Sequence, residues 1–389
     1  MAYHTTPYLL LFLPAALLFY QITPAKWRSY TLLIFSYLFF WSFSEKLIIY
    51  LIGTTFLTHH ICIWMDTMDK RDKRKKRVFQ LGILLLLGTI LCLKYRNFFF
   101  GNVSKLAMVL HIDWSYQDQL IFLPIGISFY TLSAIGYMAD VYWGKVKAEY
   151  SLVKTALFLG FFPIIVEGPI CRWEDVESTL FKNESVKAAN VFKGSYRIIW
   201  GLFKKMIIAD RLAVLVDKVY VGYESYSGAV IVAAAISYTI QLYMEFSGCM
   251  DMVIGSAGLF GIRLPENFSQ PFFAKTCTDF WKRWHITLGV WFKNYIFYPV
   301  SISKTARKWN KFTRKHFKGN FGKYMSRMGI AAMALFPVWI SNGLWHGPRW
   351  NYIFYGLYYF GLIFMGLALE PVRDRILAVL HINPESIFY

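Results

Sequence analysis

The stretch MGIAAMALFPVWISNGLWHG, residues 328–347, joins a continuous apolar run to a polar end. The apolar part is typical of a helix that crosses a bilayer, and Asn342 and His346 follow where such a helix would reach an aqueous surface or cavity. Imidazole has an unperturbed pKa near neutrality, so His346 is suited to taking a proton from a hydroxyl and passing it on. Gly343 and Gly347 would let another backbone or a substrate approach closely.

Similar apolar runs recur along the whole chain of 389 residues, of which 56% are hydrophobic and 19% aromatic. The runs are 7–20, 30–43, 47–64, 78–93, 120–138, 152–165, 229–243, 328–340 and 350–369. They predict an all-α, polytopic integral membrane protein. The first run follows no basic segment and precedes no small-residue cleavage site, so we expect a retained helix and not a signal peptide. Residues 196–214 mix apolar and charged side chains, which favours a tilted, re-entrant or interfacial helix.

The chain carries 42 Lys and Arg against 23 Asp and Glu, a formal charge of +19. The basic residues lie between apolar runs, which indicates positively charged cytoplasmic loops and excludes a nucleic-acid-binding domain. We expect the basic cluster at 66–77, which includes Lys70 and Arg71, to be cytoplasmic and the N-terminus to lie outside. The five cysteines are scattered, so the sequence predicts neither a disulfide framework nor a metal site.

Two polar clusters interrupt the apolar pattern. Glu245, Ser247 and Asp251 follow an apolar run, and at membrane depth we expect the carboxylates to face a cavity or to pair with nearby basic residues. The second cluster, DFWKRWH at 279–285, follows Thr276, a plausible helix cap. A continuous helix there would place one apolar stripe and one polar stripe on different faces: Trp281, Trp284, Leu288 and Trp291 on the first, and Lys282, His285 and Gly289 on the second.

No Asp or Glu occurs from residue 280 to residue 369, although basic residues crowd 304–327. This imbalance is typical of a cytosolic loop against anionic lipid. It also fits a landing surface for an acidic or phosphate-bearing partner such as coenzyme A or an acyl carrier protein. The two interpretations are compatible.

Two histidines, His285 and His346, each lie among Trp and polar residues beside apolar runs. Either could be a structural anchor at the membrane interface. Together they suit acyl transfer to a hydroxyl, with His346 as the base and His285 as a group that orients substrate or stabilises an oxyanion. A rival hypothesis is an acyl-enzyme on Cys249 or Cys277, although neither has a helper motif beside it.

At these clusters the sequence resembles the membrane-bound O-acyltransferases (MBOAT), and within that family the bacterial alginate O-acetyltransferase-like branch. The matching motifs are LPIGISFY (123–130), DVY (140–142), EGPI (167–170), EFSG (245–248) with Asp251, LFGI (259–262) with PENF (265–268), DFWKRWHI (279–286) and GLWHG (343–347).

The resemblance implies that His346 is the family's essential histidine and His285 its second one. It also implies a ring of transmembrane and re-entrant helices around a central tunnel. We expect further binding or orienting side chains at Asn342, Trp345, Asp279, Trp281, Arg283, Trp284 and Ser247. The expected parts are N-terminal helices at 1–119, a catalytic core at 120–350, and a last helix with a polar tail at 351–389. This branch usually continues with further helices, so the chain is expected to be truncated or short.

The expected activity is O-acyl transfer, most simply of acetyl, from a cytosolic thioester to hydroxyls of an extracellular polysaccharide or another cell-envelope glycan. The donor would be acetyl-CoA or an acyl carrier thioester, and no permanently bound cofactor is expected. The location would be a bacterial plasma membrane, among membrane lipids and possible extracytoplasmic acetyltransferase partners. Two alternatives stay open: transfer of D-alanine from a carrier protein to teichoic acid, and a transporter or channel without enzyme activity.

Overall fold

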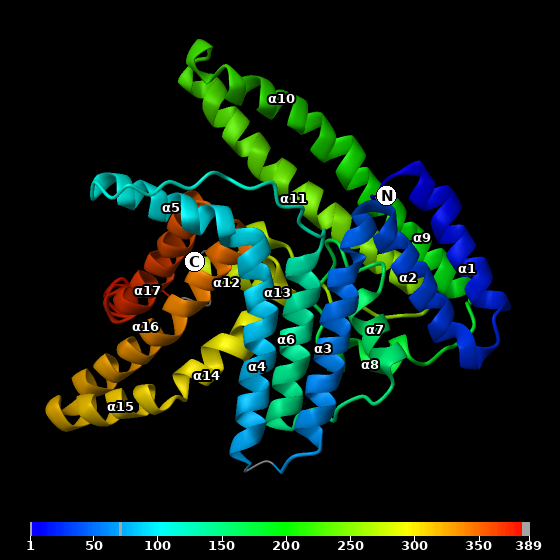
Figure 1. The fold of residues 1–389 in the computed structure, drawn as a ribbon. Helices are drawn as coiled ribbons and strands as arrows, with labels where there is room; N and C mark the ends of the chain where they lie inside the picture. Colours follow the sequence, from blue (N-terminus) through cyan, green and yellow to red (C-terminus); the bar gives the residue numbers. More distant parts are fainter. Residues whose placement is uncertain (1, 70–71, 383–389) are drawn as a thin grey trace. The chain divides into compact units, whose positions relative to one another are not determined.

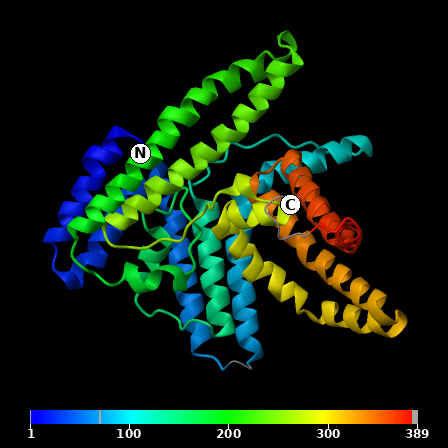
Figure 2. The ribbon, with the colours of Figure 1, turned by 180° about the vertical axis from the view of Figure 1, so that it is seen from behind.

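The computed structural model describes residues 2–69 and 72–382, and within these ranges the regular structure is helical (Figures 1 and 2). The chain divides into two compact units. The first contains Met1–Leu93 and Gln119–Ser269, and the second contains Lys94–Asp118 and Gln270–Tyr389. Lys70 and Arg71 of the predicted cytoplasmic cluster, and residues 383–389 of the predicted polar tail, lie outside the described residues.

The helices of the first unit are α1 (Leu13–Ile22), α2 (Arg28–Ser44), α3 (Ile48–Asp66), α4 (Lys73–Ile90), α6 (Ile127–Trp143), α7 (Leu152–Gly160), α8 (Trp173–Leu180), α9 (Ala188–Leu202), α10 (Asp210–Val221) and α11 (Gly228–Leu259). A π-helical segment, Pro7–Phe12, precedes α1, and another, Phe203–Ala209, joins α9 to α10. In both views α3, α4 and α6 lie side by side, and α9 with α10 runs along α11.

Glycines let α9 and α11 approach each other closely. A Cβ atom on Gly201 would lie 2.5 Å from the carbonyl oxygen of Gly248, and one on Gly255 would lie 2.8 Å from that of Gly194. Each helix therefore presents two glycines, seven positions apart, to the backbone of the other. Larger side chains at these positions would push the helices apart.

Two of the predicted spans are wrong in their extent. Residues 120–126 are not helical, because Pro124 and Gly126, at φ 76°, turn the chain before α6 begins at Ile127. Nearly all of α6 is buried, so its apolar residues pack inside the protein. The predicted run 152–165 contains the short helix α7, whose nine residues reach about 13 Å and cannot cross a ~30 Å hydrocarbon core.

The helices of the second unit are α5 (Arg96–Val109), α12 (Cys277–Arg283), α13 (Ile286–Phe292), α14 (Tyr298–Ser301), α15 (Lys304–His316), α16 (Gly319–His346) and α17 (Trp350–Val379). A π-helical segment, Leu91–Tyr95, leads into α5. The basic helix α15 packs on α16, where Trp309 Nε1 donates a hydrogen bond to the Met325 carbonyl over 3.1 Å. The lysines and arginines of α15 are exposed, because this region contains no acidic residues that could neutralise them.

Five helical segments of the described chain are long and apolar enough to cross a membrane: Ala25–Asp66, Lys73–Val109, Gly228–Leu259, Gly319–His346 and Trp350–Val379. The first contains both α2 and α3, linked by a short turn at Glu45–Leu47. The apolar helix Pro7–Ile22 is shorter. The prediction of an all-α, polytopic membrane protein is thus confirmed.

Candidate functional site

The C-terminal end of α16 carries Asn342 and His346 one helical turn apart, and it packs tightly against the start of α17. A Cβ atom on Gly343 would lie 2.2 Å from the Tyr352 carbonyl oxygen, and one on Gly347 would lie 2.5 Å from the Tyr352 ring. The prediction that these glycines permit a close approach is confirmed, and the approaching group is the first turn of α17. This packing fixes the backbone on which His346 stands.

His346 is the last residue of α16, and its ring is accessible among aromatic side chains. Its ring centroid lies 4.9 Å from that of Trp345, 5.6 Å from that of Tyr355 and 6.0 Å from that of Tyr352. Asn342 is buried, and its Oδ1 atom has no hydrogen-bond partner among the described residues. The turn therefore presents a titratable ring beside a carboxamide oxygen that is available to accept a hydrogen bond.

His285 lies at a break between two short helices. Its backbone is left-handed, with φ 48° and ψ 52°, so α12 ends at Arg283 and α13 begins at Ile286. The expected continuous helix with separate apolar and polar stripes is therefore wrong, because a left-handed residue interrupts a right-handed helix. Non-glycine residues in this conformation are uncommon and concentrate at functional sites.

The break buries His285 and brings it to the end of α16. Its side chain is 5% exposed, and its ring meets the Trp345 indole edge to face, with centroids 5.5 Å apart. The indole of Trp345 is thus in contact with both histidine rings. Burial, and to a lesser extent the neighbouring His346, lower the pKa of His285 to about 3, so the His285 ring is neutral at physiological pH.

The other predicted residues of this cluster lie on α12 and at its end. Trp281 packs edge to face against Trp339 of α16 and Tyr359 of α17, with centroid distances of 5.0 and 4.8 Å. Trp284 instead stacks on Phe280, 5.6 Å away. The two tryptophans therefore occupy different surroundings, and Trp281 ties α12 to the helices that carry His346.

Asp279 and Arg283 form an ion pair along α12, with Arg283 Nε 3.1 Å from Asp279 Oδ2. This hydrogen bond holds the pKa of the Asp279 carboxyl below its ordinary value. The predicted cap is present, because Thr276 Oγ1 accepts a hydrogen bond from the Asp279 backbone over 3.0 Å. Asp279 therefore fixes the first turn of α12 and orients Arg283.

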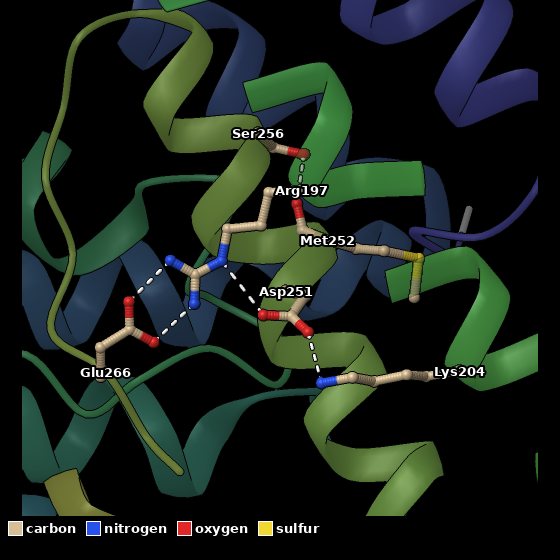
Figure 3. Close-up of polar contacts among 6 residues, drawn as sticks. All are labelled: Arg197, Lys204, Asp251, Met252, Ser256 and Glu266. Atoms are coloured by element: carbon tan, nitrogen blue, oxygen red, sulfur yellow. Dashed lines mark hydrogen bonds and ion pairs between the residues drawn. The ribbon is translucent and has the colours of Figure 1, made fainter. Parts of the chain in front are cut away.

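Ser247, also predicted as a site residue, belongs to α11 of the first unit. It is 3% exposed, and its hydroxyl has no hydrogen-bond partner among the described residues. On the same helix, the predicted pairing of the acidic cluster with basic residues is confirmed. Asp251 accepts from Arg197 Nε over 3.1 Å and from Lys204 Nζ over 2.7 Å, as Figure 3 shows. Glu245 pairs with Lys205 over 2.6 Å.

Arg197 extends this charge network to the loop after α11. The guanidinium group of Arg197 donates two hydrogen bonds to the carboxylate of Glu266, at 2.6 and 2.5 Å (Figure 3). Glu266 is part of the PENF motif noted in the sequence. Arg197 therefore joins α9, α11 and this loop within the first unit. Asp251 and Glu266, which belong to two of the quoted motifs, thus have a structural role.

Sequence reasoning missed three residues near His346. Tyr352 and Tyr355 contact its ring, and their spacing at the start of an apolar helix would have placed them on one face. Lys94 donates a hydrogen bond of 2.7 Å from Nζ to the carbonyl of Trp345. The sequence feature that could have identified Lys94 is its charge at the end of the apolar run 78–93, where a cation is unfavourable and commonly functional.

The rival cysteine residues have surroundings that do not favour a nucleophile. Cys249 lies against Glu167, with its sulfur 3.2 Å from Oε2, and an adjacent carboxylate disfavours a thiolate. Burial raises the pKa of the Cys277 thiol. Among the described residues, no group of three or more His, Cys, Asp or Glu side chains is placed to hold a metal ion.

Comparison with known proteins gives a consistent set of relatives. Residues 145–314 match the membrane-bound O-acyltransferase family, MBOAT. The chain is 31% identical over 370 residues to the probable alginate O-acetylase AlgI of Pseudomonas putida, covering 95% of this chain and 70% of the relative. It is 28% identical over 408 residues to the peptidoglycan O-acetyltransferase of Helicobacter pylori, covering 95% and 70%. The teichoic acid D-alanyltransferase of Bacillus subtilis is 29% identical over 241 residues, covering 60% and 56%.

Proposed function

The chain belongs to the membrane-bound O-acyltransferase family, so it is a multi-pass membrane acyltransferase, and we propose that it moves an acetyl group from a thioester to hydroxyls of a polysaccharide or cell-envelope glycan. The observation that carries this proposal is the contact of both His285 and His346 with Trp345. One ring is accessible and the other is buried and neutral, which suits two different tasks at one reacting centre.

In the proposed reaction, His346 accepts the proton of the acceptor hydroxyl while the hydroxyl oxygen attacks the thioester carbonyl. The carbon–oxygen bond forms, and the carbonyl becomes a tetrahedral oxyanion. Collapse of this intermediate breaks the carbon–sulfur bond, and the protonated His346 returns its proton to the departing thiolate. An O-acetyl ester and a free thiol result, with no change of oxidation state.

The neighbouring side chains have supporting roles in this proposal. The buried, neutral ring of His285 would donate an N–H hydrogen bond to the oxyanion, and Asn342 would accept a hydrogen bond from the incoming hydroxyl. Trp345 would hold the two rings in place. Trp281, Trp284 and the Asp279–Arg283 pair would shape and orient the substrate path. For Ser247 an orienting role is proposed from the sequence motif alone.

The donor in this proposal is acetyl-CoA or an acyl carrier thioester reaching the cytosolic face, used as a substrate. The acceptor is a glycan, and an extracytoplasmic acetyltransferase could pass the group on. Support comes from the names of relatives that O-acetylate alginate and peptidoglycan.

The test compares envelope glycans by mass spectrometry in cells that carry the wild-type protein, His346→Ala or no copy of the gene. The expected result is an acetyl ester that depends on the gene and is lost with His346→Ala at unchanged membrane abundance. His316→Ala, which changes an exposed histidine of α15, is the matched control and should keep full activity. Full activity of His346→Ala would overturn the mechanism.

A second candidate is D-alanyl transfer to teichoic acid, and the similarity to the Bacillus subtilis enzyme favours it. In that case the donor is a D-alanyl thioester on a carrier protein. Turnover of the purified protein with acetyl-CoA alone supports the first candidate. Turnover that requires a D-alanylated carrier, with a mass increase on the acceptor of one alanyl group, supports the second.

A further inference from the structure

Lys94 occupies an unusual place for a cation. It follows the uncharged apolar run 78–93 and lies in the π-helical segment Leu91–Tyr95, within a stretch long and apolar enough to cross a membrane. π-Helical turns within longer helices are rare and are frequently found at functional sites. A half-buried ammonium group in such a place is costly unless it has a specific partner.

One partner of Lys94 is the helix end that carries His346. Its Nζ donates a hydrogen bond of 2.7 Å to the main-chain carbonyl of Trp345, 251 positions away in the sequence. The last four carbonyls of a helix lack partners inside the helix, and α16 ends one residue later at His346. Lys94 therefore satisfies one of these carbonyls and places a positive charge at the negative end of the helix dipole.

A second contact holds the other side of the same connection. Trp350, the first residue of α17, donates a hydrogen bond of 2.9 Å from Nε1 to Asn102 Oδ1 on α5, and its ring lies 5.7 Å from that of Phe98. The segment 347–349 between α16 and α17 is thus held at one end by Lys94 and at the other by Asn102 of α5. Movement of this segment would change the direction of the His346 ring.

We propose that Lys94 is a positioning residue for His346, acting through the carbonyl of Trp345. This inference rests on the proposed role of His346 as the base. A base must stand within hydrogen-bond reach of the hydroxyl, and a displacement of about 1 Å can lower a rate by about 100-fold. Lys94 sets this geometry without touching substrate.

The test compares Lys94→Met, which removes the donor and the charge, with Lys94→Arg, which keeps both. The matched control is Lys105→Met, which changes an exposed lysine of α5. For Lys94→Met the expected result is a kcat lowered by about 10- to 100-fold with KM changed less than about threefold. Lys94→Arg should recover a large part of kcat, and Lys105→Met should match the wild type.

A second readout does not depend on turnover. At pH 8, the rate at which diethyl pyrocarbonate modifies His346, followed by peptide mass spectrometry, should rise at least about threefold in Lys94→Met, because the turn is loosened. If Lys94→Met does not fold, Lys94→Gln replaces it in both measurements. An unchanged kcat together with an unchanged modification rate would overturn the inference. Activity retained by His346→Ala would instead overturn the proposed function, while the modification rate would still report the coupling.

Discussion

The rings of His285 and Trp345 meet edge to face with their centroids 5.5 Å apart, and the same indole lies 4.9 Å from the ring of His346. His285 and His346, which are 61 positions apart in the sequence, therefore contact the same side chain. The left-handed backbone of His285 makes this possible, because it ends α12 and lets α13 begin in a new direction. The following expectations test this arrangement and the packing that supports it.

Trp345 should be needed for its ring and not for its indole nitrogen. Trp345→Ala should lower kcat by about 10-fold or more, because both histidine rings lose the surface that orients them. Trp345→Phe keeps an aromatic ring and should retain more activity. Initial rates of acyl transfer by the purified variants measure this, and equal rates for the two variants would argue against an orienting ring.

The stability of the protein should respond to the protonation of His285. The pKa of this buried ring is about 3 in the folded protein, against 6.5 for a free histidine. As the pH falls below about 6.5, the unfolded chain binds a proton that the folded chain does not, so stability is lost progressively towards about pH 3. Melting temperatures in detergent should therefore fall less steeply with acid in His285→Gln than in the wild type. Parallel curves would contradict a buried neutral histidine.

The close contact of α16 with α17 should be sensitive to one methyl group. A Cβ atom on Gly356 would lie 2.3 Å from the Trp339 carbonyl oxygen, so Gly356→Ala should lower the free energy of unfolding by about 1–3 kcal/mol. Gly361→Ala, on the same helix, meets no heavy atom within 4 Å and should be neutral or slightly stabilising. Thermal unfolding of the two variants measures this difference. Equal losses of stability would show that the close contact at Gly356 does not restrict the size of the side chain there.

The charge network of the first unit should depend on Asp251. Asp251→Asn leaves Arg197 and Lys204 without a shared counter-charge in a place where Asp251 is only 9% exposed. We expect a loss of about 2 kcal/mol in stability. Glu184→Gln, which removes an exposed partner of Lys182 and Lys187, should change the melting temperature little. A loss as large in Glu184→Gln would contradict this difference.

Much of the architecture follows from local composition. Long apolar runs predict membrane helices because a bilayer demands about 20 apolar residues with internally satisfied backbones, and α2, α3, α16 and α17 agree with the predicted runs. The pairing of Asp251 and Glu245 with basic residues was also predictable, since unpaired charges are too unfavourable in such surroundings. The motifs around His285 and His346 likewise pointed to acyl transfer.

Other features depend on contacts between distant segments, which periodicity does not report. The run 152–165 is apolar because α7 and the segment after it are buried, not because they cross a membrane. No glycine or proline adjoins His285, so the local sequence does not indicate the helix break there.

The polar end of the opening stretch combines both kinds of information. Its residues specify an apolar helix that ends in a histidine, because side-chain chemistry and helix length are local properties. The hydrogen bond from Lys94 and the contact with the His285 ring form at that helix end only after the chain has packed. Local sequence therefore supplied the reactive group, and long-range packing supplied its orientation, because the energies that orient a ring come from neighbours that are distant in the chain.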